Sequence, residues 1–300
     1  MRTSLALISV FIVVTIACTM VKSATTKTTY GGLMNHPGES QSKFAIIMGI
    51  SNYQNPEMSA LVYAHNDIEA WFRTLQHRKY AVSVLSDTQS RKDLAKHIGF
   101  DESQIHDATE PILYRHIDAI TAVINQNPPT LRTTFAFVCS SHGERLVSAS
   151  GEVSSSIMAY DIDTGHTNFD NVIHDWELVE RLSPLLQNPK VDVIVIVDAC
   201  FSGGFVKRLM QSDKLGNLTV VSSSTIDKSS FQVKRLRHSA LSWFLTQSLP
   251  TCQYRLVQSV YKANDDWHKF TMTMPEESRQ KVDAPSGLFQ IYTKMDQISL

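Results

Sequence analysis

Residues 193–204 read VIVIVDACFSGG, an apolar run that ends in an acidic residue, a cysteine and two glycines. A second apolar run, Thr133 to Cys139, leads into a Ser-Ser-His-Gly segment at 140–143. Runs of this kind are typical of strands buried on both faces of a parallel sheet. Reactive groups in open α/β sheets gather at the carboxyl ends of the strands. The pattern therefore predicts that Cys200 and His142 form a nucleophilic pair at one edge of the sheet.

Apolar segments and amphipathic segments alternate along the rest of the chain. We expect strands at Lys43 to Ile50, Tyr80 to Leu85, Thr133 to Cys139, Val191 to Asp198, Leu218 to Ser222 and Leu288 to Thr293. We expect helices at Asn66 to Leu75, Glu110 to Ile124, Trp176 to Leu186 and His238 to Leu249. Alternating strands and helices predict an α/β fold, with a mostly parallel sheet covered by helices on both faces.

The first residues have the pattern of a secretory signal. Arg2 is followed by an apolar run from Leu5 to Val21, and small residues then offer a cleavage site near Ser23. We therefore predict a signal peptide at 1–23, a flexible leader at 24–42 and a single domain at 43–300. The predicted location is the secretory pathway, either secreted or in an endomembrane lumen. The alternative is an uncleaved signal anchor, because the apolar run approaches the length that spans a bilayer; no later segment is long and apolar enough to do so.

Composition and charge narrow the classes of function. The chain is 43% hydrophobic and 19% charged, which indicates a folded core. Its 28 basic and 29 acidic residues nearly cancel, so we expect no nucleic-acid partner. The histidines lack the spacing of metal ligands, so we expect no resident metal or cofactor. Oligomeric state cannot be read from these features.

Cysteine usage leaves a free thiol to explain. Removal of the signal peptide also removes Cys18 and leaves Cys139, Cys200 and Cys252. An odd number in an oxidising compartment leaves at least one thiol unpaired, and a free Cys200 fits this. The sequence does not decide whether Cys139 and Cys252 pair, because Cys139 ends a predicted buried strand and can equally be a buried thiol.

The turn after the predicted strand offers the chemistry that a thiol nucleophile needs. A thiol reacts as the thiolate, so it requires a nearby base or positive potential, and a helix N-terminus supplies part of that potential. We expect Gly203 and Gly204 to allow a tight turn there. The backbone N–H groups of Gly143 and Cys200 would form an oxyanion hole. The alternatives are a small buried core residue at Cys200 and an ordinary surface histidine at His142.

Three segments together resemble the caspase-like cysteine peptidases, in particular the metacaspases and their bacterial relatives, in a clan shared with legumain. The segments are FAIIMGISNY at 44–53 followed by Asn66 and Asp67, FVCSSHG at 137–143, and VDACFSGG at 197–204. The resemblance covers roughly Lys43 to Leu249. It implies a three-layer αβα sandwich with a six-stranded sheet, mostly parallel, whose last strand is antiparallel.

The same resemblance implies a thiol endopeptidase that acts on protein or peptide substrates. Cys200 would attack the scissile carbonyl to form a thioester, and His142 would protonate the leaving amine and then activate water. Asp67, Ser140 and Asp198 would line the S1 pocket, whose carboxylates would select Arg or Lys at P1. The alternatives are a helix cap at Asp67 and a structural hydrogen bond at Asp198.

Departures from the metacaspase pattern keep the subfamily open. Ala199 stands where many metacaspases have Cys, and Ser141 stands where Gly is common. The resemblance to metacaspases also implies calcium as an activator, for which Asp161 and Asp163 are candidates by their position after the histidine; the alternative for both is a solvated turn. A secretory signal is unusual for metacaspases but common in legumain-like peptidases, which cleave after Asn or Asp.

Two rival functions and one regulatory feature therefore remain. The chain could be a legumain-like, Asn-specific peptidase or transamidase, or a catalytically silent caspase-fold protein that binds or regulates. The enzyme could also be made as a zymogen. In that case the basic run Lys234-Arg235-Leu236-Arg237 is a candidate site of self-processing.

Overall fold

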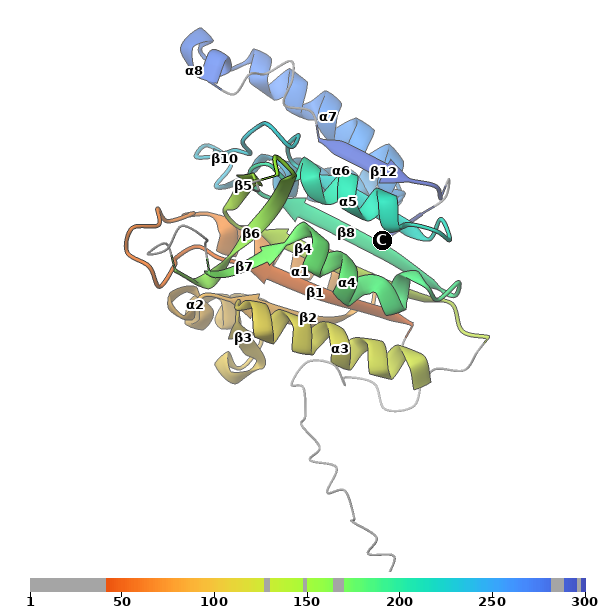
Figure 1. Ribbon diagram of the computed structural model, residues 1–300. Coiled ribbons are helices and arrows are strands. Elements are labelled where there is room, and N and C mark those ends of the chain that lie inside the picture. The colour runs from red at the N-terminus through yellow and green to blue at the C-terminus, as the bar shows by residue number, and fades with distance from the viewer. Residues whose placement is uncertain (1–41, 127–129, 148–149, 164–169, 282–288, 296–297) are drawn as a thin grey trace, which may run out of the picture.

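The computed structural model describes residues 42–126, 130–147, 150–163, 170–281, 289–295 and 298–300 (Figure 1). The predicted signal peptide and all but the last residue of the predicted leader lie outside this range, so both stay predictions. The domain bounds of 43–300 also stay a prediction. Within the described ranges, no helix is both long and apolar enough to cross a bilayer.

A seven-stranded sheet forms the centre of the molecule, in the order β12-β9-β8-β4-β1-β2-β3. Only β12 is antiparallel to its neighbour, so the predicted mostly parallel α/β sheet is confirmed. The sheet has one strand more than the predicted six, because the three-residue β3 pairs with β2 and is too short to show in a hydrophobic pattern. The strands are β1 (Lys43–Gly49), β2 (Ala81–Ser86), β3 (Ile105–Asp107), β4 (Thr133–Ser140), β8 (Val191–Asp198), β9 (Leu218–Ser222) and β12 (Gln290–Thr293).

Helices cover both faces of this sheet, which gives the three-layer sandwich (Figure 1). One face carries α3 (Glu110–Gln126), α4 (Asp175–Leu186) and α5 (Gly203–Ser212), and the other carries α1 (Ala64–His77), α6 (Ala240–Thr251) and α7 (Leu256–Met272). Successive strand residues point to opposite faces. Ile46 and Met48 accordingly pack in the first layer, and Ala45 and Ile47 in the second. The remaining helices are α2 (Thr88–Ile98), a 3-10 turn at Glu102–Gln104, and α8 (Glu276–Lys281).

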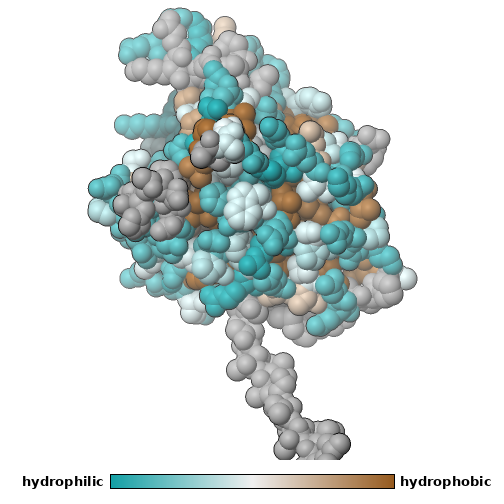
Figure 2. Space-filling view, viewed as in Figure 1, coloured by the Kyte–Doolittle hydropathy of each residue, from teal (hydrophilic) through white to brown (hydrophobic). Residues whose placement is uncertain are grey.

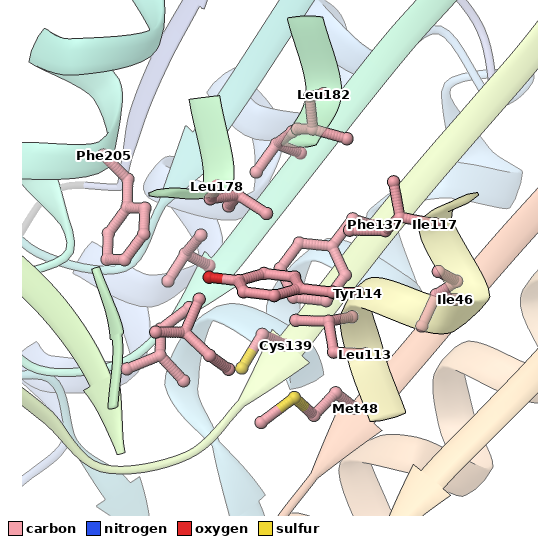
Figure 3. Packing of buried hydrophobic residues seen from close by; sticks show 14 of the residues in the cluster. Ile46, Met48, Leu113, Tyr114, Ile117, Phe137, Cys139, Leu178, Leu182 and Phe205 are labelled. Carbon is pink, nitrogen blue, oxygen red and sulfur yellow. The ribbon is translucent and has the colours of Figure 1, made fainter. Parts of the chain in front are cut away.

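Cys139 lies in the hydrophobic layer beneath α3 and α4. Figure 3 shows Cys139 among apolar side chains, close to Tyr114 and Met48. Its side chain is fully buried, and burial raises the pKa of this thiol to about 12. Cys252 ends α6 on the opposite face of the sheet. Both cysteines and Cys200 are free, so Cys139 and Cys252 do not pair.

Two small antiparallel sheets add to the carboxyl end of the main sheet, at the left of Figure 1. The first comprises β5 (Gly143–Val147), β6 (Val153–Asp163) and β7 (Asp170–His174). The second is a minimal pair, β10 (Gln232–Val233) and β11 (His238–Ser239). The predicted helix from His238 was therefore too long at its start, since α6 begins at Ala240.

The outer surface over α3, α4 and α5 is mainly hydrophilic, with hydrophobic residues visible in scattered patches (Figure 2). Large apolar side chains with substantial exposure on these helices include Val123, Trp176 and Met210. Singly exposed apolar residues are ordinary on a folded surface. These three residues therefore do not by themselves mark a binding surface.

Candidate active site

The register between β4 and β8 brings the two sequence motifs together. Ser140 lies opposite Asp198 in this parallel pair, so His142 and Cys200 each follow the last paired residue by two positions. The Ser141 N–H donates to the Asp198 carbonyl across the same strand ends, at 3.2 Å. The two chains stay close beyond the strands, because a Cβ atom on Gly143 would lie only 2.2 Å from the Cys200 carbonyl oxygen. Gly143 is thus a close-approach residue, which fixes the backbone of His142 beside that of Cys200.

The turn that carries Cys200 is strained at Phe201 and not at the glycines. Phe201 has a φ of 57°, a left-handed conformation that a bulky residue rarely adopts. Its carbonyl accepts a 2.6 Å hydrogen bond from Ser155 Oγ on β6. The expected role of Gly203 and Gly204 in turning the chain was therefore wrong. They permit close packing instead: a Cβ on Gly203 would lie 2.6 Å from the Ile226 nitrogen, and one on Gly204 would lie 2.0 Å from Ser155 Oγ.

The backbone around Cys200 leaves one donor available. The Ala199 N–H donates to Ser223 Oγ at 3.1 Å, and the Ser202 N–H donates to Ser224 Oγ at 3.1 Å. The Phe201 N–H donates to the Lys228 carbonyl at 2.8 Å. The Cys200 N–H, by contrast, has no acceptor in the described part of the chain. It stands just before the N-terminus of α5, where the helix dipole adds positive potential. This N–H can therefore act as an oxyanion donor.

The imidazole of His142 is held by the loop after β1. Its Nε2 lies 2.8 Å from the Ser59 carbonyl and 3.2 Å from Ser59 Oγ, while the His142 N–H donates to the Tyr53 hydroxyl at 2.8 Å. A carbonyl only accepts, so the neutral ring carries its proton on Nε2. Nδ1 then holds the lone pair and can act as a base.

The thiol of Cys200 contacts a different loop. Its Sγ accepts from the Ser230 N–H at 3.3 Å and lies 3.8 Å from the Ser230 carbonyl. Cys200 and His142 make no hydrogen bond with each other among the described contacts. The two reactive groups are neighbours through their backbones, and each is paired with a serine of a flanking loop.

Asp67 is fully buried in the first turn of α1. Its carboxylate accepts from Ser140 Oγ at 2.8 Å, from His238 Nδ1 at 2.8 Å and from the Ser239 N–H at 3.2 Å. The N-cap of α1 is Tyr63, so the alternative of a helix cap at Asp67 is wrong. The carboxylate instead connects α1 to β4 and β11.

Asp198 is the second buried carboxylate, at the end of β8. It accepts from Ser230 Oγ at 3.0 Å, from the Ser242 N–H at 2.9 Å and Ser242 Oγ at 2.8 Å, and from Ser239 Oγ. Burial, followed by the negative charge of Asp67, raises its pKa above the usual range. Ser239 therefore bridges the two acids, with its N–H on Asp67 and its hydroxyl on Asp198.

The structure thus brings all six sequence candidates to one edge of the sheet: Asp67, Ser140, His142, Gly143, Asp198 and Cys200. Sequence reasoning missed the residues that hold them, which are Tyr53, Ser59, Ser230, His238, Ser239 and Ser242. Four of them are serines, of which Ser59 and Ser230 lie in loops, Ser239 in β11 and Ser242 in α6, and none of the four belongs to a motif. The sequence placed His238 at the start of a predicted helix, so it gave no indication that the residue contacts Asp67.

The candidate calcium residues lie elsewhere, on β6. Asp161 uses its carbonyl to accept from Asn171 Nδ2 at 3.0 Å, and burial raises the pKa of its carboxyl. In the described ranges, no group of three or more His, Cys, Asp or Glu is placed to hold a metal. Residues 164–169, which directly follow Asp163, lie outside these ranges. Calcium activation stays a hypothesis.

Comparison with known proteins identifies the family. A model described as the caspase domain, peptidase family C14, matches residues 42–285, which is most of the chain and includes both strand-end motifs. The chain belongs to the caspase domain family. This membership supports a function of the cysteine-peptidase type, with proteins as the general class of substrate.

Solved structures support the same fold. The crystal structure of caspase-1 from Spodoptera frugiperda matches with a TM-score of 0.53 and 12% sequence identity, covering 88% of this chain and 92% of that chain. At this identity the likeness shows the fold alone. A search of curated proteins found no match. The caspase-like fold expected from the three motifs is therefore confirmed, whereas subfamily and specificity depend on the site itself.

Proposed function

We propose that this caspase-family chain is an endopeptidase in which Cys200 and His142 act as a catalytic dyad, cleaving after Arg or Lys. The contact between Gly143 and Cys200 carries the proposal of the dyad, because it holds the two reactive residues on adjacent backbones. The two buried acids Asp67 and Asp198, which Ser239 bridges, carry the proposal of specificity. The proposed setting is the secretory pathway, with the enzyme made in a latent form.

His142 carries one proton in each half-reaction. His142 Nδ1 takes the proton of the Cys200 thiol, and the sulfur attacks the scissile carbonyl carbon. The Cys200 N–H stabilises the oxyanion, with Gly143 as the second proposed donor. The imidazolium returns the proton to the amine as the C–N bond breaks, which leaves a thioester. His142 then takes a proton from water as the water oxygen attacks the thioester carbonyl; the C–S bond breaks, the acid product leaves, and that proton passes to the departing thiolate.

The Ser59 contact gives His142 its protonation pattern. Because Nε2–H donates to the Ser59 carbonyl, the imidazolium formed during catalysis is stabilised at Nε2 while Nδ1 exchanges the proton. Tyr53 supports the same segment, since its hydroxyl accepts from the His142 N–H. We assign these two residues positioning roles, because each acts on His142 through a hydrogen bond.

The acidic pair supports a preference for a basic P1 side chain. Asp198 lies two residues before the nucleophile, and Ser230 contacts both the Asp198 carboxylate and the Cys200 thiol. A cation that reached these carboxylates would lie next to the reacting bond. Charge-assisted hydrogen bonds to a buried acid favour guanidinium and ammonium groups over neutral side chains.

The contacts of the reactive groups in this structure support a latent state. The thiol is paired with Ser230 and not with His142, and internal donors occupy both carboxylates. A substrate that bound here would have to displace donors that Ser230 and His238, in the 225–239 loop, give to the thiol and to the carboxylates. The same observation favours the second candidate, a catalytically silent caspase-fold binding protein, if that loop never moves.

Hydrolysis of matched fluorogenic peptides that end in Arg, Lys, Asn or Asp tests the proposal. Purified mature protein would be assayed with and without calcium, beside Cys200→Ala and His142→Ala. The proposal expects cleavage after Arg and Lys, abolished in both variants, and Asp67→Asn should weaken it about 10- to 100-fold, as for a lost charged hydrogen bond. Cleavage after Asn would move the chain to the legumain-like class. No turnover in any condition would favour the silent binding protein.

A further inference from the structure

His238 occupies the outer side of the Asp67 carboxylate. Its Nδ1 lies 2.8 Å from Asp67 Oδ1, and its ring packs on the indole of Trp243, with centroids 5.0 Å apart and planes inclined by 36°. The His238 side chain is 15% exposed, whereas Asp67 is fully buried. His238 therefore stands between the buried acid and solvent.

The other donors to Asp67 are less able to leave. Ser140 Oγ belongs to a buried residue at the end of β4, and the Ser239 donor is a main-chain N–H in β11. The backbone before His238 is also tied down, because Asn66 Nδ2 donates to the Arg237 carbonyl at 2.7 Å. Rotation of the His238 side chain is thus the change that would uncover Asp67 with the least disturbance.

The surface beside His238 has room for that rotation. A shallow hollow between α1 and α6 is lined by residues that include His238, Asn66, Trp243 and Gln247, together with Glu69 and Arg73, which form an ion pair with each other at 2.8 Å. An imidazole turned into this hollow would keep contact with polar groups and solvent. The site it leaves would be formed by the Asp67 carboxylate and the Trp243 indole.

A carboxylate beside an indole ring suits the binding of a guanidinium or ammonium ion. Arginine pairs with carboxylates through its fork of donors and also stacks on aromatic faces. His238 already imitates this, with one N–H on the acid and its ring on the indole. We propose that His238 is a specificity-determining residue that occupies a cation subsite made by Asp67 and Trp243, and that a basic P1 side chain must displace it. This inference rests on the proposed function and deepens it.

The arrangement explains how the pocket would reject neutral side chains. Displacement of His238 leaves the buried Asp67 carboxylate short of one donor, and an unsatisfied buried charge is costly. A basic P1 side chain replaces the lost donor, whereas an aliphatic side chain does not. His238 therefore adds a penalty against apolar P1 residues, which is a form of selection by exclusion.

Variants at His238 test the proposal in two directions. His238→Ala empties the subsite, so we expect KM for an Arg peptide to fall about tenfold, the effect of one charged hydrogen bond, with kcat unchanged. His238→Arg fills the subsite permanently, so KM should rise by a similar factor. His268→Ala, an exposed histidine on α7, is the matched control and should change neither constant. If His238 merely supported the fold, His238→Ala would lose activity and His238→Arg would retain normal KM.

A binding measurement separates this proposal from the proposed peptidase function. Calorimetric titration of acetyl-arginine amide into Cys200→Ala protein, with and without His238→Ala, requires no turnover. Tighter binding in the double variant, by about tenfold, would support the subsite even if no peptide were cleaved. Equal affinity in the two proteins, both folded by thermal melting, would overturn the role of His238 while leaving cleavage after Arg intact.

Discussion

Gly143 touches the backbone of Cys200: a Cβ atom at residue 143 would lie 2.2 Å from the Cys200 carbonyl oxygen. The contact links the segment after β4 to the segment after β8, just beyond their last paired residues. A Cβ atom here would collide with a backbone oxygen, which cannot rotate away as the end of a flexible side chain can. The separation of the two catalytic candidates therefore depends on the absence of one side chain.

Gly143→Ala should abolish most peptidase activity. The added methyl forces the two backbones apart, and misplacement of reacting groups by about 1 Å costs on the order of a hundredfold in rate. Gly99→Ala is the control. Gly99 has a φ of 75° with open space around its Cβ, so this variant should lose stability and keep activity per folded molecule. Equal activity in wild type and Gly143→Ala would refute the role assigned to the contact.

The three described thiols should differ in their reaction with iodoacetamide. Cys200 and Cys252 are partly exposed, whereas Cys139 is fully buried with a pKa raised to about 12. Peptide mass spectrometry of the folded protein at pH 8 should therefore find carbamidomethyl groups on Cys200 and Cys252. Cys139 should react only after denaturation. A disulfide between Cys139 and Cys252, or early labelling of Cys139, would contradict the structure.

The raised pKa of Asp198 predicts that the free energy of unfolding depends on pH. Burial and then the charge of Asp67 raise its pKa in the folded state above the ordinary value of 3.8. Between the unfolded-state pKa and the folded-state pKa of Asp198, the folded protein binds more protons than the unfolded chain. The contribution of Asp198 to the free energy of unfolding therefore falls as pH rises through its folded-state pKa. Urea unfolding across that range should show the decline in wild type and its loss in Asp198→Asn. The exposed Asp265→Asn is the control and should leave the decline in place.

Self-processing should occur in the short link between β10 and β11. Lys234, Arg235 and Arg237 are exposed there, so this basic run is accessible to a second molecule. Incubation of the purified protein should produce a cut in 234–237 that mass spectrometry can place. The cut should be absent in Cys200→Ala and reduced in an Arg235→Gln, Arg237→Gln double variant. A cut that persists in Cys200→Ala would come from another protease.

The sequence was most informative where apolar runs were continuous. The predicted strands Val191–Asp198 and Leu218–Ser222 coincide with β8 and β9, because a strand buried on both faces leaves little freedom in its boundaries. Shorter elements gave no usable signal. The three residues of β3 cannot display a period, and the two of β11 were absorbed into the start of the α6 pattern.

The site was predictable only as far as its motifs extended. Cys200, His142 and Asp198 stand at or just after the ends of the buried strands β4 and β8, so topology brings them together, whereas Asp67 was expected there only from the family resemblance. Ser59, Ser230 and His238 reach the site from loops whose paths depend on tertiary packing. The turn at Phe201 shows the same limit, because the backbone of this positive-φ residue is held by hydrogen bonds with Ser155 and Lys228, which are distant in sequence.

The most direct test of the central claim is labelling with a peptidyl-arginine electrophile, such as an acyloxymethyl ketone, followed by intact-mass and peptide analysis. The account predicts one adduct, on Cys200, that forms far more slowly in His142→Ala and is slowed by excess acetyl-arginine amide. A matched asparaginyl reagent should react poorly. A folded protein whose Cys200 stays unmodified by the arginyl reagent, or reacts equally well without His142, would contradict the proposed dyad and its basic specificity.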